Sequence, residues 1–194
     1  MSVLQSGITK SLAEDYTIDQ SLRFTRGDGS YLSFTDGTPT DGKKMTASVW
    51  VKGPSTVGGG KMLKATGSDT DAWMIEGGVS QASPNMKFEL YGNQSVAQGT
   101  RITSSALFRD PSAWYHYLVS VDTTEAADAD RVKMYVNGSE ITTTAPTSNY
   151  INQNEVLPNF NNDGNPQFVQ DSDTGSALDY LAEYHFIDGQ ALTP

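Results

Sequence analysis

The sequence contains no cysteine. A disulfide framework, a zinc site built on thiolates and a cysteine nucleophile are therefore excluded. Positive charge is also scarce, with 13 Lys and Arg against 23 Asp and Glu, and the formal net charge is −10. Since no basic cluster is available to neutralise a phosphate backbone, the composition argues against a nucleic-acid partner.

Long apolar runs are absent as well. None approaches the roughly 20 residues that a membrane-spanning helix needs, so no membrane partner is expected. Residues 1–20 lack the basic start and the continuous apolar core of a signal peptide. The sequence therefore predicts synthesis in the cytoplasm without directed secretion.

What the chain does contain is a series of short segments of alternating polarity, separated by clusters of Gly, Ser, Asn and Asp. The clearest runs from Met45 to Lys52. In it the apolar residues Ala47, Val49 and Val51 alternate with Thr46, Ser48 and Trp50. Further strands are predicted at Ser21–Thr25, Tyr31–Phe34, Lys61–Ala65, Ala72–Glu76, Lys87–Tyr91 and Arg101–Thr103. The pattern predicts an all-β fold, an antiparallel two-sheet jelly-roll sandwich over residues 21–194 behind a short N-terminal arm at 1–20.

The strongest local signal is a hairpin in the second half of the chain. Trp114–Asp122 and Arg131–Asn137 are both patterned as strands, and the second stops at Asn137-Gly138. This dipeptide favours a type I′ turn, because both residues tolerate a positive φ. We expect a further strand at Glu140–Thr144, and a late strand within 179–194 that returns beside the first.

Two segments lie outside this pattern. The arm carries apolar residues at intervals of four, a weak helical pattern, at Leu4, Ile8, Leu12 and Tyr16. It is either a frayed terminus or a segment that docks on a neighbouring subunit. Pro146–Thr174 is rich in Asn, Asp and Gln and predicts a long loop that carries a function or wraps a neighbour.

Candidate catalytic groups are few. His116 and His185 lie in predicted strands among aromatic residues, and Glu183 lies near the second; buried strand histidines with satisfied nitrogens are a simpler interpretation than a zinc site. A glycosidase needs two acids roughly 5–9 Å apart, and jelly-roll glucanases carry theirs on one strand as Glu-x-Asp-x-x-Glu. No such run occurs here, because Glu76 and Glu89 are isolated in their strands. We therefore expect no enzyme.

Two kinds of binding residue remain. Acid-rich loops offer carboxylates for Ca²⁺ at Asp69, Asp71, Asp171 and Asp173, although solvated loop charge explains the same residues. A surface site for a ligand such as a glycan is predicted in the long loop, at Asn149, Tyr150, Asn152 and Asn154. Trp50, Trp73 and Trp114 are expected to lie in the core between the sheets.

Four blocks of the sequence, taken in order, carry a family resemblance: SLRFTRGDGSYLSFT, GTPTDGKKMTASVWVKG, LFRDPSAWYHYLVSVDTTEAADADRVKMYVNG and YLAEYHFIDGQALTP. Together they resemble a laminin-G/concanavalin-A-like module of virion proteins in tailed phages, especially marine ones. The resemblance runs from about Ser21 to Pro194. It implies a lectin-like jelly roll displayed on a phage particle, and it implies no enzyme.

Within that resemblance, the length and the arm favour a capsid decoration or cement protein on the virion surface. An alternative is an adhesin module of a tail fibre or head fibre that binds host or environmental glycans. The implied partners are the major capsid protein or other virion subunits, with glycans as further ligands and a homotrimer as a plausible assembly. A single sandwich that ends at Pro194 leaves no room for a fibre's anchor and stalk, which favours the decoration protein.

Overall fold

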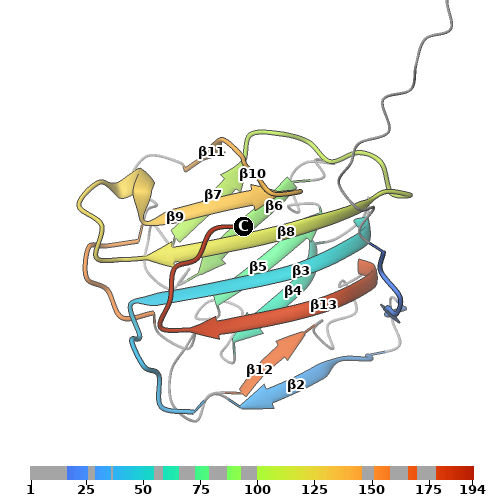
Figure 1. Ribbon diagram of the computed structural model, residues 1–194, viewed down its shortest axis with the longest axis horizontal. Coiled ribbons are helices and arrows are strands. Elements are labelled where there is room, and N and C mark those ends of the chain that lie inside the picture. Colours follow the sequence, from blue (N-terminus) through green and yellow to red (C-terminus); the bar gives the residue numbers. More distant parts are fainter. Residues whose placement is uncertain are drawn as a thin grey trace, which may run out of the picture.

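The computed structural model describes residues 17–25, 29–35, 37–54, 59–65, 73–78, 87–92, 100–145, 151–157, 166–169 and 178–194. These residues form two antiparallel sheets that lie face to face, as Figure 1 shows. Within them the only helix is the short 3₁₀ turn η1 at Asp128–Asp130. The all-β jelly-roll prediction is therefore confirmed.

Sheet A is the front layer of Figure 1 and has six strands among the described residues. In spatial order they are β1 (Leu22–Arg23), β13 (Leu178–Asp188), β3 (Lys44–Pro54), β8 (Trp114–Asp122), β9 (Val132–Val136) and β10 (Ser139–Glu140). The late strand β13 pairs with β1, as the sequence predicted.

Sheet B lies behind it and has seven strands among the described residues (Figure 1). Their spatial order is β11 (Thr143–Thr144), β7 (Thr100–Ser104), β6 (Lys87–Gly92), β5 (Trp73–Gly78), β4 (Gly59–Ala65), β12 (Pro166–Val169) and β2 (Leu32–Thr35). Strands β1 and β2 thus lie on corresponding edges of the two sheets.

The core fills the space between the sheets and follows the alternation seen in the sequence. Because successive strand residues point to opposite faces, one set from each strand enters this layer. Its largest fully buried members are Tyr117, Phe88, Met45, Met62, Leu63, Leu90, Ile102, Met134 and Ile151. Two of them stack across the layer, since the rings of Tyr117 and Phe88 lie 4.2 Å apart and nearly parallel. Burial raises the pKa of the Tyr117 hydroxyl well above its usual range.

The Asn137-Gly138 turn is confirmed. Both residues have positive φ, 51° and 78°, and the turn joins β9 to β10. The strand predicted at Glu140–Thr144 is in fact two strands: β10 pairs with β9 in sheet A, and β11 pairs with β7 in sheet B. The chain changes sheets at this point, which alternating polarity cannot reveal.

The long loop predicted over Pro146–Thr174 contains a strand, so that part of the prediction is wrong. Residues 166–169 form β12, which pairs with both β2 and β4. The surrounding residues are polar and the strand is only four residues long, so no periodicity was available to mark it.

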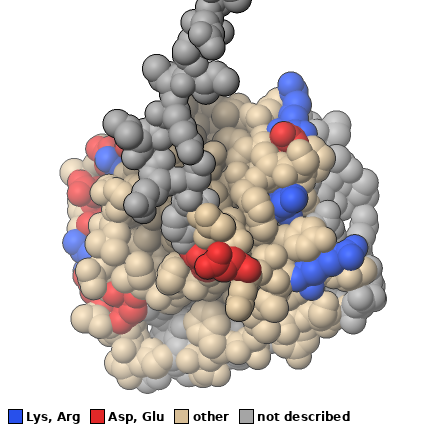
Figure 2. Space-filling model, turned by 45° about the vertical axis from the view of Figure 1, so that its right-hand side comes forward, with Lys and Arg blue, Asp and Glu red and all other residues tan. Residues whose placement is uncertain are grey.

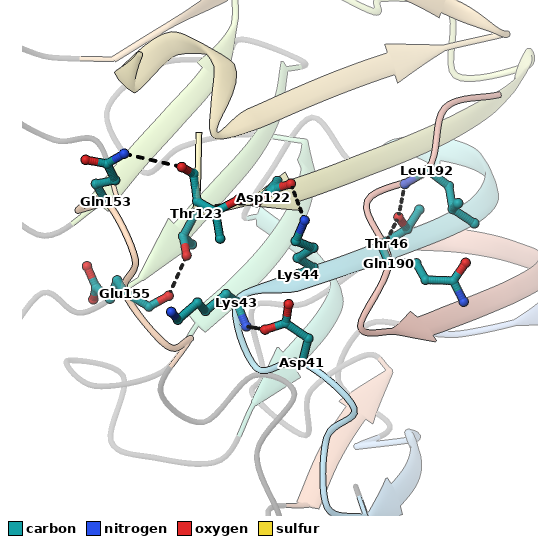
Figure 3. Close-up of polar contacts among 11 residues, drawn as sticks. Asp41, Lys43, Lys44, Thr46, Asp122, Thr123, Gln153, Glu155, Gln190 and Leu192 are labelled. Carbon is teal, nitrogen blue, oxygen red and sulfur yellow. Dashed lines mark hydrogen bonds and ion pairs between the residues drawn. The ribbon is translucent and has the colours of Figure 1, made fainter. Parts of the chain in front are cut away.

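The C-terminal residues cross the outer face of sheet A at one end of β3 (Figures 1 and 3). Thr46 holds them twice, because its hydroxyl donates to the Gln190 carbonyl and accepts from the Leu192 amide, both at 2.8 Å. The chain reaches this position through Gly189, whose φ is 69° and whose amide donates to the Lys44 carbonyl. We call this the sealed end of sheet A.

Candidate functional site

At its opposite end, sheet A presents aromatic and basic side chains to solvent. One residue from each of four neighbouring strands lies in register there, in the order Arg23 on β1, Tyr180 on β13, Lys52 on β3 and Trp114 on β8. We call these four the aromatic–cation row. Tyr180, Lys52 and Trp114 are partly exposed and Arg23 is exposed. With strands spaced about 4.8 Å apart, the row spans about 14 Å.

The two cations of the row lie against its rings. The Lys52 ammonium lies 6.0 Å from the ring centroids of both Trp114 and Tyr180, and the Arg23 guanidinium lies 5.9 Å from that of Tyr180. The centroids of the Trp114 and Tyr180 rings are 6.5 Å apart, and the rings meet edge to face. Cation–π attraction holds the cations in place without neutralising their charge.

Four other basic residues in the described part of the chain are paired with carboxylates, whereas Lys43, Lys87 and Arg109 form no ion pair among the described residues. Lys44 pairs with Asp122, Arg101 with Glu89, Arg131 with Asp128 and Lys133 with Asp130. In contrast, neither Arg23 nor Lys52 forms an ion pair within the part of the chain that the structure describes. The row is therefore a place where a protein of net charge −10 displays unneutralised positive charge.

A second row lies beside the first. Trp50 on β3 is paired with His116 on β8, and their rings lie 5.1 Å apart. The His116 Nε2 atom lies 2.8 Å from the Ser48 hydroxyl. Burial lowers the pKa of His116, although the nearby carboxylate of Glu183 acts in the opposite direction. The histidine thus packs and hydrogen-bonds within the sheet, as the sequence predicted.

The bulge in β13 places Glu183 at the margin of this surface. The pairing of β13 with β3 shifts register between Ala182 and His185, and Glu183 has a φ of 48°. Because of this bulge, Glu183 and His185 are not alternate residues of one regular strand face, and His185, which was expected to be buried in its strand, is exposed. We call the surface formed by residues 22–23, 50–52, 114–116 and 180–183 the open end of sheet A.

The expectation that Trp50 and Trp114 lie between the sheets is wrong. Both are on the outer face and partly exposed. The signal was in the alternation, because Val49 and Val51 already form the inward set and leave Trp50 on the opposite face. The side chain of Trp73, the third expected core tryptophan, lies outside the described residues.

A different group of polar residues lies on sheet B. The Glu89 carboxylate, only 4% exposed, accepts hydrogen bonds from the guanidinium of Arg101 and the hydroxyl of Thr103 on β7. On the other side, the backbone register sets Glu76 of β5 opposite Glu89. The sequence alone does not reveal this register, because it joins residues of two separate strands.

An apolar hollow of about 160 Å³ opens at the edge of the sandwich, beside β1. Its lining comes from both sheets and includes Leu22, Phe24, Leu32, Val169, Leu181 and Tyr184. Such a lining suits an apolar side chain better than a hydroxyl-rich ring.

Of the ligand residues predicted in the long loop, Asn152 and Asn154 are described, and both belong to a tight turn. The side-chain amide of Asn152 donates to the Glu155 carboxylate. Asn154 has a φ of 61°, and its backbone N–H donates to the Thr123 carbonyl. Figure 3 shows the neighbouring anchors of this turn, including the Thr123 hydroxyl on the Glu155 carbonyl. These contacts give both asparagines a structural role.

The remaining predicted binding residues, Asn149, Tyr150, Asp69, Asp71, Asp171 and Asp173, lie outside the described residues, as does most of the N-terminal arm. Within the described ranges, no group of three or more His, Asp or Glu side chains is placed to hold a metal ion. The same ranges include no helix long and apolar enough to cross a membrane.

Charge is spread unevenly over the molecule. Figure 2 shows Lys and Arg side chains gathered on one half of the face in view, while most Asp and Glu side chains lie on the other half and near the centre. The acidic composition therefore leaves areas of the surface basic.

Comparison with known proteins supports the fold. A model of the family described as the concanavalin A-like lectin/glucanases superfamily matches residues 26–185. No curated protein matches the sequence. Among solved structures, the chain is similar to the native heptameric SAP-like pentraxin from Limulus polyphemus, with 15% identity, a TM-score of 0.53, and coverage of 80% of this chain and 68% of that one.

The chain is also similar to domains LG4-5 of the mouse laminin alpha1 chain. The identity is 15% and the TM-score 0.53, with 89% of this chain and 44% of that one covered. The chain thus spans less than half of the laminin fragment. At this identity the likeness to both structures concerns the fold alone.

Proposed function

The chain belongs to the concanavalin A-like lectin/glucanases superfamily, and we propose that it is a non-enzymatic binding module whose ligand site is the open end of sheet A. The observation that carries this proposal is the aromatic–cation row. Three large aromatic side chains, Tyr180, Trp114 and the adjacent Trp50, are partly exposed together on the outer face of sheet A. Rings of this size usually bury their apolar faces, so their grouping at the surface favours a ligand that covers them.

The ligand class that suits this surface is a glycan. A sugar ring has one face of C–H groups, which packs on an aromatic ring, and a rim of hydroxyls, which hydrogen-bond to polar neighbours. The open end supplies both partners, since Lys52 and Arg23 carry donors beside the rings.

Binding to a panel of neutral and acidic oligosaccharides, measured by isothermal titration calorimetry with and without Ca²⁺, tests this proposal. Trp114→Ala should weaken binding roughly tenfold, the equivalent of about 1.4 kcal/mol. Val156→Ala is the control, because Val156 is 54% exposed but lies in the turn that is bonded to Thr123, near the sealed end of the sheet. Equal losses in both variants, or no binding to any sugar, would reject a glycan site at the open end.

We further propose that the module decorates the capsid of a phage virion. This rests on the sequence resemblance described above, with the major capsid protein or another virion subunit as the partner and a homotrimer as the assembly. Glycan binding at the open end is compatible with a decoration protein and equally with the alternative, a fibre adhesin. Cryo-microscopy of purified virions distinguishes them: many copies on the capsid lattice support decoration, and copies confined to a fibre tip support the adhesin.

A glycoside hydrolase on sheet B is the second candidate, favoured by the register that sets Glu76 opposite Glu89. Against it, the Glu89 carboxylate is already engaged by Arg101 and Thr103. A reducing-sugar assay on the ligands bound above decides between them. Product release that disappears in Glu89→Gln would establish the hydrolase and overturn the non-enzymatic proposal.

A further inference from the structure

We infer that the open end of sheet A selects anionic glycans, whose carboxylate or sulfate groups bind at Lys52 and Arg23. This inference rests on the proposed function and specifies its ligand. The starting point is the charge of the row. Both cations are fixed beside rings, and neither is paired with an acid in the described part of the chain.

The position of Lys52 is decisive. Its ammonium lies at the same 6.0 Å from the centroids of Trp114 and Tyr180, so it neighbours both of the rings on which sugar rings would pack. An acidic group on a ring stacked there comes within reach of the ammonium, which has three hydrogen-bond donors. The rings also displace water around the contact, which strengthens a charge-assisted hydrogen bond.

Arg23 extends the same preference to the edge of the sheet. It lies on the exposed strand β1, and its guanidinium is 5.9 Å from the centroid of the neighbouring Tyr180 ring. A planar guanidinium matches the two oxygens of a carboxylate or sulfate. The cations alternate with the rings along the row, so a polymer with an acidic group on successive sugars fits the arrangement.

One acidic residue bounds the site. Glu183 is exposed and lies on the side of the second row, in the bulge of β13. The acidic groups of the ligand are expected at the first row, where Lys52 and Arg23 lie.

The test uses ligand pairs that differ only in charge. Oligogalacturonate and its methyl ester share the same ring and distinguish recognition of a carboxylate; dextran sulfate and dextran distinguish recognition of a sulfate. We expect at least one acidic member to bind roughly tenfold more tightly than its neutral counterpart at low salt, as a charge-assisted hydrogen bond implies. The preference should shrink at high salt, where exposed charges are screened, and persist in a chelating buffer.

Lys52→Met removes the ammonium but keeps the apolar stem, and should abolish most of the acidic-to-neutral affinity ratio. Lys133→Met is the matched control, since this partly exposed lysine lies in the same sheet but is next to Asp130, with a nitrogen–oxygen distance of 3.8 Å. An equal loss of the ratio in both variants would mean diffuse attraction and overturn the inference. If acidic and neutral members bind equally and Trp114→Ala weakens both, the inference fails while the proposed function stands; if neither binds, both fail.

Discussion

The two ends of sheet A share one outer face but are built differently. Along β3 the outward positions run from Thr46, which is 0% exposed, and Ser48, which is 8% exposed, to the partly exposed Trp50 and Lys52. Thr46 is bonded to the C-terminal segment and Ser48 to His116, whereas the large Trp50 side chain is partly in solvent. Burial alone would favour the reverse arrangement, because Trp gains more than Thr from leaving water. The ligand site proposed at the open end would account for this difference.

The largest effect is expected at the sealed end, from Gly189→Ala. A Cβ at this position would lie 2.9 Å from the Thr40 Cβ and 3.2 Å from the Asp41 amide nitrogen, and the φ of 69° disfavours any L side chain. We expect a loss of about 3 kcal/mol in the free energy of unfolding, measured by urea denaturation.

Gly138→Ala separates the two causes of that loss. Gly138 has a φ of 78°, but a Cβ there meets nothing within 4 Å. Gly138→Ala should lower the free energy of unfolding only by the cost of the positive φ, about 1–2 kcal/mol. Equal losses in the two variants would show that the close approach of Gly189 to Thr40 contributes nothing.

The second effect concerns the hydroxyl that fastens the tail. Thr46→Val keeps the shape of the side chain but leaves the Gln190 carbonyl and the Leu192 amide without their partner. We expect a loss of about 2 kcal/mol in thermal or urea unfolding, and a near-native value for Thr46→Ser, which keeps the hydroxyl. An unchanged stability in Thr46→Val would mean that the tail does not seal this end in solution.

The third effect is a pH dependence at the open end. Since burial lowers the pKa of His116, the folded protein binds fewer protons than the unfolded chain near the ordinary value of about 6.5. The contribution of neutral His116 to the free energy of unfolding is therefore fully present above about pH 6.5. It declines as the pH falls and stops declining below the lowered pKa of the folded protein. Urea denaturation across this range should show the decline in the native protein and a weaker one in His116→Gln. Parallel curves would contradict it, and His185→Gln provides the control.

The smallest effect is expected from Lys52→Met. Its cation–π contacts are on a partly exposed surface, so the free energy of unfolding should change by less than about 1 kcal/mol. Combined with the loss of ligand selectivity, this would mark the open end as functional and the sealed end as structural. A loss as large as that of Thr46→Val would erase the contrast between the two ends.

Most of the fold was predictable because its signals are local. Alternation in Met45–Lys52 and the Asn137-Gly138 turn act within a few residues, and both were confirmed. The split between β10 and β11, and strand β12, depend on which distant strand each short segment meets. Local polarity carries no such information.

The candidate site was not predictable as a whole, because it is a product of register. Arg23, Lys52, Trp114 and Tyr180 come from four separate strands, and only the pairing of those strands brings them into one row. The surface site expected in the polar loop stays a prediction, and Asn152 and Asn154 of that loop belong to a tight turn. The outward direction of Trp50 was the one part of the site that alternation could have given.

The most direct test of the binding face is a map of backbone amide chemical shifts during titration with the acidic oligosaccharide that binds best. The two ends of sheet A, and the two sheets, are then compared in a single experiment. We expect the shifts to concentrate at residues 22–23, 50–52, 114–116 and 180–183 and to leave 44–46 and 189–192 unchanged. Shifts centred on 87–92 and 100–104 of sheet B would place the ligand beside Glu89 instead and contradict the assignment of the open end.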